Sequence, residues 1–139
     1  MFEKILCAND GSEQAEHALA LAIAMAKASK SELHMVSVEE IDYMPEFIEE
    51  VREETGTAAR RFRSVLQRAR AMTEDQQVGI RTHLLTGHAV RDIVKLAAEI
   101  KADLLVIGAT GHSRFYERMI GSRADRIVQL APCPVLVVK

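Results

Sequence analysis

Cysteine, net charge and long apolar runs are all scarce in this sequence, and each shortage excludes a class of protein. The two cysteines, Cys7 and Cys133, fit neither a metal-binding spacing nor a disulfide framework, so we expect two buried, unreactive thiols. A formal net charge of −2 gives no general attraction to nucleic acid or to acidic membranes. The most apolar stretch, 18–26, is much shorter than the roughly 20 residues that span a bilayer, and the charged residues Glu3 and Lys4 argue against a secretory leader. We therefore expect a cytoplasmic protein that binds neither nucleic acid nor membrane.

Apolar residues, 48% of the chain, form short runs that alternate with longer segments of helical periodicity. The short runs are continuous, which is typical of strands covered on both faces of a parallel sheet. We expect strands at 4–9, 33–38, 80–85, 103–107 and 134–138, and helices at 13–27, 45–72, 90–100 and 122–130. Gly56 lies off the apolar seam of the second helix and either loosens that helix or divides it in two. The alternation predicts one α/β domain over residues 1–139, with an open five-stranded parallel sheet, right-handed crossovers and helices on both faces.

Two loops follow strands at the edge where open parallel sheets bind ligands. One loop is 9–12, and the other begins at Gly108 and ends at Gly121 and Ser122, directly before a helix. Glycine permits tight turns and lets a ligand approach the backbone amides, and the first N–H groups of a helix attract anions. The second loop therefore predicts a phosphate site, although neither a Walker lysine motif nor Gly-x-Gly-x-x-Gly occurs.

Structural explanations compete with this interpretation. The segment 10–13 has capping-box spacing, so Asp10 or Ser12 would then serve only to cap the following helix. Ser122 and Asp125 have the same spacing, and there the two roles coexist because a capped helix start still offers free amides. The five histidines are scattered and show no paired-ligand spacing, which argues against a structural metal site.

Three landmarks together resemble the universal stress protein family, in its ATP-binding branch. The family signature is Gly, two residues, Gly, nine residues and then Gly-Ser or Gly-Thr, and it is reproduced by Gly108, Gly111, Gly121 and Ser122. The segment 4–12 is similar to the first strand and acidic turn of the family, and 131–138 is similar to its last strand. The resemblance covers essentially the whole chain and implies a Rossmann-like fold of the HUP type.

The resemblance also implies a site for ATP, or for ADP or AMP, often with a divalent metal such as Mg²⁺. By position, Asp10 would hold the ribose or nearby phosphates, and Ala8, Val38 and Ile107 would surround the adenine. The signature glycines and the hydroxyl of Ser122 would bind the phosphates.

Two residues depart from the family pattern. Thr110 stands where relatives often have histidine or arginine, and Arg123 stands where they usually have a small apolar residue. Arg123 either reaches a phosphate or shifts the preference toward a shorter nucleotide. The preference among ATP, ADP and AMP therefore stays open.

The resemblance implies a nucleotide-dependent regulatory protein of the stress response, acting as a homodimeric switch or adaptor toward an unidentified protein partner. The apolar strand 135–138, expected at an edge of the sheet, must be covered, and the resemblance implies that it forms the dimer contact. A slow ATP hydrolase is one alternative, although the sequence offers no convincing group to activate water. A nucleotide-free interaction module is the other, and the intact signature argues against it.

Overall fold

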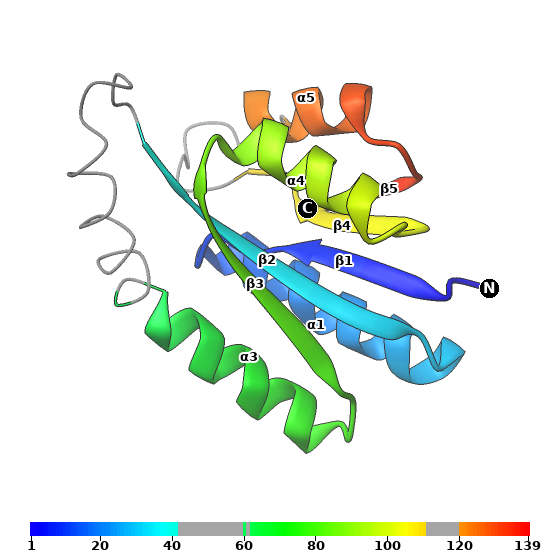
Figure 1. Cartoon of the computed structure of the whole chain (residues 1–139). Coiled ribbons are helices and arrows are strands. Elements are labelled where there is room, and N and C mark those ends of the chain that lie inside the picture. The colour runs from blue at the N-terminus through cyan, green and yellow to red at the C-terminus, as the bar shows by residue number, and fades with distance from the viewer. Residues whose placement is uncertain (42–59, 61, 111–119) are drawn as a thin grey trace.

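The five strands form one parallel sheet in the order β3-β2-β1-β4-β5, which confirms the predicted architecture (Figure 1). A computed structural model describes residues 1–41, 60, 62–110 and 120–139. The strands are β1 (Lys4–Ala8), β2 (Glu32–Glu40), β3 (Ile80–Gly87), β4 (Leu104–Gly108) and β5 (Val135–Val138). The helices are α1 (Glu13–Ser29), α3 (Arg63–Asp75), α4 (Ala89–Glu99) and α5 (Ser122–Leu130).

Helices cover both faces of the sheet and enclose two cores (Figure 1). Helices α1 and α3 pack on one face, which includes Cys7 and Met35, and α4 and α5 pack on the other, which includes Leu6 and Val36. Successive residues of a strand point to opposite faces, so a strand between two helical layers needs apolar residues at nearly every position. This explains the continuous apolar runs of the sequence.

Ser12 is the N-cap of α1, as one of the two capping alternatives predicted, and its Oγ accepts a hydrogen bond from the amide of Ala15 at 3.2 Å. Asp10 does not cap this helix in the way proposed above, because its Oδ1 accepts the amide of Ser12 at 2.9 Å. The helix ends at Ser29, and its C-cap Lys30 adopts the left-handed conformation with φ 54°. It is therefore two residues longer than the sequence predicted.

Other boundaries also differ from the prediction. Strand β2 continues to Glu40, because its pairing with β3 extends to the register pair Glu40 and Gly87. Of the predicted helix 45–72, only residues 60 and 62–72 are described, and α3 covers them from Arg63 onward; the rest, including Gly56, lies outside the described residues. Helix α3 ends at Asp75, three residues beyond the expected end.

The two thiols have different surroundings. Cys7 is fully buried as expected, and burial raises its pKa to about 12, so the thiol stays protonated and unreactive. Cys133 is only half-buried, and burial raises its pKa as well.

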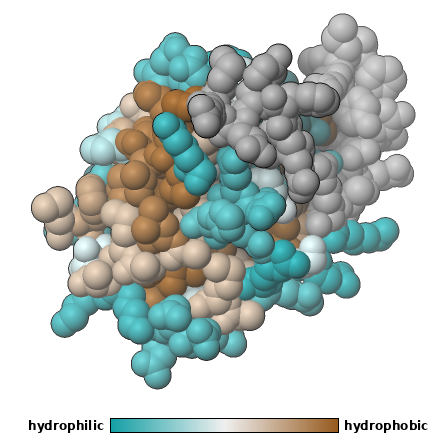
Figure 2. All heavy atoms as spheres, turned by 180° about the vertical axis from the view of Figure 1, so that it is seen from behind, coloured by the Kyte–Doolittle hydropathy of each residue, from teal (hydrophilic) through white to brown (hydrophobic). Residues whose placement is uncertain are grey.

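Within the described parts of the chain, no helix is long and apolar enough to cross a membrane. On the face seen from behind, apolar side chains gather in a band beside polar ones (Figure 2).

Candidate functional site

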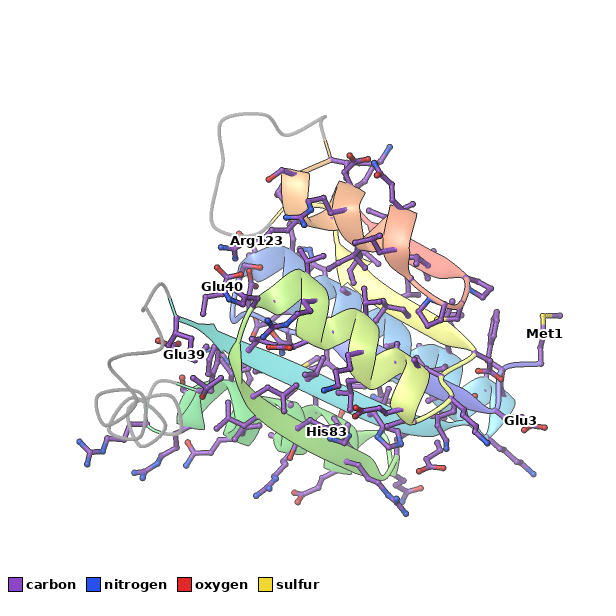
Figure 3. The ribbon with its side chains drawn as sticks, turned by 45° about the horizontal axis from the view of Figure 1, so that its top comes forward. Met1, Glu3, Glu39, Glu40, His83 and Arg123 are labelled. Carbon is purple, nitrogen blue, oxygen red and sulfur yellow. The ribbon has the colours of Figure 1, made fainter. Side chains whose placement is uncertain are left out.

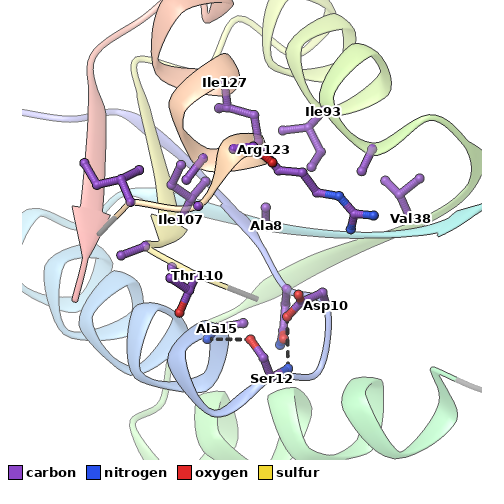
Figure 4. A pocket seen from close by; sticks show the side chains of 18 of the residues that line it. Ala8, Asp10, Ser12, Ala15, Val38, Ile93, Ile107, Thr110, Arg123 and Ile127 are labelled. Carbon is purple, nitrogen blue, oxygen red and sulfur yellow. Dashed lines mark hydrogen bonds between the residues drawn. The ribbon is translucent and has the colours of Figure 1, made fainter. Parts of the chain in front are cut away.

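A cavity of about 570 Å³ opens at the carboxyl ends of β1, β2 and β4 (Figure 4). The chain leaves β1 toward β2 on one side, and β4 lies on the other side of β1, so the cavity sits at the point where the strand order reverses. Its volume lies within the range of about 300–1,000 Å³ that is usual for small-molecule sites. It is lined by Ala8, Asn9, Asp10, Ser12, Ala15, Val36, Val38, Ala89, Ile93, Ile107, Gly108, Ala109, Thr110, Ile120, Gly121, Ser122, Arg123, Ala124 and Ile127.

The structure brings the predicted site residues together. All of them line this one cavity except Gly111, which lies outside the described residues. Strand ends position Ala8, Val38 and Ile107, and the start of α5 positions Ser122 and Arg123. The segments that carry them are far apart in the sequence, and the parallel sheet gathers them at a single edge.

One part of the cavity is a slot of aliphatic side chains. Ala8, Val38 and Ile107 come from the sheet, and Ile93 and Ile127 face them from α4 and α5 (Figure 4). The sequence analysis missed the two helical isoleucines. The predicted helices 90–100 and 122–130 contain these two residues, but helical periodicity did not indicate which end of the sheet the helices cover.

The turn after β1 is held by hydrogen bonds between side chains and backbone. Asn9 is buried, and its Oδ1 accepts the amide of Gly11 at 3.0 Å, while the carboxylate of Asp10 accepts the amide of Ser12. The backbone oxygen of Asn9 accepts the hydroxyl of Ser37 at 2.6 Å. Gly11 has φ 86°, a conformation that costs other residues free energy. These contacts fix the turn that carries Asp10 into the cavity, and the positioning role of Asn9 was not foreseen.

The segment after β4 is anchored to its surroundings. The amide and the hydroxyl of Thr110 both donate to Oε1 of Gln14, each at 2.7 Å. The amide of Gly121 donates to the carbonyl of Ala109 at 2.7 Å, so the two ends of the loop meet. The amide of Ala109 donates to the carbonyl of Val138. The amides of Ala109 and Thr110, at the Gly108 end of the loop, therefore already have acceptors within the protein.

Helix α5 supplies the amides that remain. Its N-cap is Gly121, which has no side chain to bond to the first turn, and Ser122 is already inside the helix. The capping box predicted for Ser122 and Asp125 is therefore wrong. The first amides of α5 have no partner within the helix and lie at the cavity, which suits an anionic group.

Two glycines of the signature are required by packing. A Cβ on Gly108 would lie 3.2 Å from the backbone carbon of Gln14 in α1, so this glycine permits a close approach of strand and helix. A Cβ on Gly121 would lie 3.3 Å from the carbonyl oxygen of Ala109. The sequence analysis explained both glycines by the approach of a ligand, and the structure adds this second reason.

Arg123 and Glu40 form an ion pair at the mouth of the cavity (Figure 3). Nη2 of Arg123 lies 2.7 Å from Oε2 of Glu40, and the other carboxylate oxygen of Glu40 accepts the amide of Ala89 at 3.2 Å. Glu40 thus ties the end of β2 to the starts of α4 and α5. The sequence analysis did not single out Glu40, since nothing in the pattern relates residues so far apart.

A second polar group lies along β2 and β3, away from the cavity lining. Nδ1 of His34 lies 2.8 Å from Nε2 of His83, and Nε2 of His34 lies 2.9 Å from the carboxylate of Glu32. The histidines looked scattered in the sequence, yet strand pairing stacks these two rings with centroids 5.1 Å apart. Burial lowers the pKa of His83, and the charges of His34 and Arg81 lower it further; the hydrogen bond from His34 lowers the pKa of Glu32. Among the described residues, no cluster of three or more histidine, cysteine or acidic side chains is arranged to hold a metal ion.

The sequence matches one protein family along its entire length. The model of the Universal stress protein family matches residues 1–139. A universal stress protein of Thermus aquaticus is 35% identical over 139 residues, with 100% of both chains covered. One of Methanocaldococcus jannaschii is 34% identical over 149 aligned positions, which cover 100% of this chain and 83% of the relative.

Solved structures share the fold. Universal stress protein UspA from Lactobacillus plantarum has a TM-score of 0.84 and 25% identity, covering 99% of this chain and 97% of its own. A universal stress protein in complex with cAMP has a TM-score of 0.76 and 22% identity, covering 99% and 97%. One from Archaeoglobus fulgidus in complex with dAMP has a TM-score of 0.65 and 23% identity, covering 100% and 98%. At these identities the last two show a common fold alone.

Proposed function

Because this chain belongs to the universal stress protein family, we propose that it is a regulatory protein that binds an adenine nucleotide in the cavity at the β1–β4 switch point. The observation that carries this proposal is the pairing of an aliphatic slot with the open amides of a helix start in one cavity of about 570 Å³. An adenine nucleotide has a flat base with apolar faces at one end and an anionic chain at the other. Two fold relatives were solved in complexes with cAMP and dAMP, which supports the same ligand class.

The base is assigned to the aliphatic slot. Ala8 and Ile107 form its floor on the sheet, Val38 forms a side, and Ile93 closes it from α4. Burial of a purine between such side chains removes apolar area from water on both partners, which contributes about 25 cal/mol for each Å². The base is therefore the part of the ligand with most to gain from this slot.

The phosphates are assigned to the start of α5. Gly121 brings the chain to the helix, and the amides of the first turn then provide donors together with the hydroxyl of Ser122. Gly108 and Thr110 act by fixing the beginning of the loop against α1. The carboxylate of Asp10 and the hydroxyl of Ser122 are oxygen ligands of the kind that Mg²⁺ accepts when it also binds phosphates. Mg²⁺ would neutralise part of the phosphate charge there.

A regulatory role is preferred over hydrolysis. Among the described residues that line the cavity, Asp10 is the only carboxylate, and it is assigned to the ribose or the metal. Phosphoryl transfer to water requires in addition a group that positions the attacking water. The bound nucleotide would instead bias assembly or recognition by a protein partner.

The edge strand β5 is the proposed assembly surface. Its four residues are half-buried, and the carbonyls of Pro134 and Val138 accept bonds from Leu105 and Ala109 on the β4 side. Successive residues of a strand direct their backbone N–H and C=O groups to opposite sides, so those of Val135 and Val137 point away from β4 and have no strand beside them among the described residues. Pairing of two such edges in a homodimer would satisfy them. Sedimentation of the intact chain measures this assembly directly.

The binding proposal is tested by filling the slot. An Ala8→Leu variant places three extra carbons on the cavity floor, in the space assigned to the base. Calorimetric affinity for ATP, ADP and AMP in Mg²⁺ should fall by at least about tenfold, because the bound base would be overpacked. The matched control is Ala20→Leu, which makes the same change on the exposed face of α1 and should bind as the wild type does. If the wild type binds none of the three nucleotides, or if both variants bind equally well, the assignment is wrong.

A further inference from the structure

We propose that Arg123, held by Glu40, forms the outer wall of the base subsite and contacts the purine ring, not the phosphates. This inference rests on the proposed function and adds a specificity-determining residue to it. It starts from the direction of the Arg123 side chain.

Arg123 begins beside the phosphate end of the site but points away from it. The residue lies in the first turn of α5, where the helix dipole disfavours a positive charge. Its side chain extends from α5 toward β2, on the side where Val38 lies (Figure 4). The guanidinium is thereby carried from the anion-binding amides to the aliphatic slot.

Glu40 fixes the guanidinium in that place. One carboxylate oxygen of Glu40 holds Nη2 of Arg123 at 2.7 Å, and the other accepts the amide of Ala89, the first residue of α4. The pair therefore spans from α5 to the wall built by β2 and α4. The side chains of Arg123 and Glu40 are 62% and 35% exposed, which places the pair at the mouth of the cavity.

The chemistry of this pair suits a flat aromatic ring better than a phosphate. A guanidinium is planar and weakly hydrated and stacks on aromatic faces, where it gains from the ring electrons. Its positive charge is already balanced by Glu40, so its attraction for a polyphosphate is reduced. A purine in the slot would lie between the floor formed by Ala8 and Ile107 and the plane of Arg123.

A contact with the base and a contact with phosphate differ in their dependence on the ligand. A base contact contributes equally to adenosine, AMP and ATP, because all three carry the same ring. A phosphate contact contributes nothing to adenosine and most to ATP. The ratio of affinities along this series separates the two roles, and a merely structural role of Arg123 would leave that ratio unchanged in the Glu40 variant described below.

The experiment is calorimetric titration of adenosine, AMP and ATP in Mg²⁺ into the intact chain and four variants. Arg123→Ala should lose about three- to tenfold affinity for each ligand, by nearly the same factor. Arg123→Lys keeps the positive charge but lacks the planar guanidinium, so its adenosine affinity should stay below that of the wild type. Arg126→Ala, on the same helix, exposed and outside the cavity lining, should bind as the wild type does. Glu40→Gln releases the guanidinium and should weaken adenosine while raising the ratio of ATP to adenosine affinity.

The outcomes distinguish this inference from the proposed function. A loss in Arg123→Ala that is absent for adenosine and grows with phosphate number would overturn the base contact while leaving nucleotide binding intact. So would an unchanged affinity ratio in Glu40→Gln, or full rescue by lysine. Failure of the wild type to bind any of the three ligands would instead remove the proposed function itself.

Discussion

The two ends of the sheet differ in whether their hydrogen-bonded polar residues surround a cavity. At the amino end they bond to one another: the carboxylate of Asp103 accepts the amides of Glu3 and Lys4 at 2.7 and 3.0 Å, and His34 bridges Glu32 and His83. At the carboxyl end they surround a cavity of about 570 Å³. The same strands therefore serve stability at one end and, in our proposal, binding at the other. Changes at the two ends should separate these properties.

The largest effect is expected at Gly121. A Gly121→Val side chain would press on the carbonyl of Ala109, which lies 3.3 Å from the position of its Cβ, and would displace the start of α5. ATP would have to draw the displaced amides back against this overpacking, which costs about 1–3 kcal/mol, so ATP affinity in calorimetry should fall by about 30-fold. The control is Gly79→Val, because a Cβ there meets nothing within 4 Å. Equal affinities in the two variants would show that the carboxyl end does not depend on this close approach.

A smaller effect, on stability and not on nucleotide binding, is expected at Asp103. Asp103→Ala removes the acceptor of two amides and should lower the free energy of unfolding in urea by about 1 kcal/mol, a value reduced because the carboxylate is partly exposed to water. Nucleotide affinity should be unchanged, since the cavity is at the other end of the strands. A variant that lost affinity but kept its stability would break the comparison.

The smallest effect is the pH dependence at the histidine pair. Burial, followed by the charges of His34 and Arg81, lowers the pKa of His83, so the folded state favours the neutral ring. The unfolded chain then binds the proton more readily, and stability that is present above about pH 6.5 is lost as the pH falls. Urea unfolding between pH 7.5 and 5.5 should record this decline, and His83→Gln should reduce it. An identical decline in both proteins would assign the pH dependence to other groups.

The fold was predictable because its signals are local. Continuous apolar runs identify buried strands such as β4, and helical periodicity identifies α4, so element order alone leads to a parallel sheet. Boundaries were less accurate where they depend on tertiary pairing, as in the extension of β2 to Glu40. The end of α1 depends on the left-handed conformation of Lys30, and this position lacks the glycine that usually marks a helix end in a sequence.

The site residues were predictable where the family resemblance supplied their positions. The prediction was incomplete where a contact joins residues that are distant in the sequence. Resemblance placed Ala8, Asp10 and Ile107 at one cavity, as the structure has them. Physical reasoning about single segments could not pair Glu40 with Arg123 or His34 with His83, because those contacts arise only when distant segments are brought together. The cap predicted at Ser12 is confirmed, whereas the capping box predicted for Ser122 and Asp125 is wrong, because the exact start of a helix decides which side chain can reach its amides.

The proposed function depends on binding of an adenine nucleotide in the carboxyl-end cavity. The most direct measurement is an amide NMR titration of the ¹⁵N-labelled chain with ATP and Mg²⁺. We expect the shifted resonances to concentrate at Ala8, Ile107 and Ser122, while those of Glu3 and Asp103 at the amino end of the sheet stay in place. A spectrum that does not change at saturating ATP, or that changes mainly at the amino end, would contradict it.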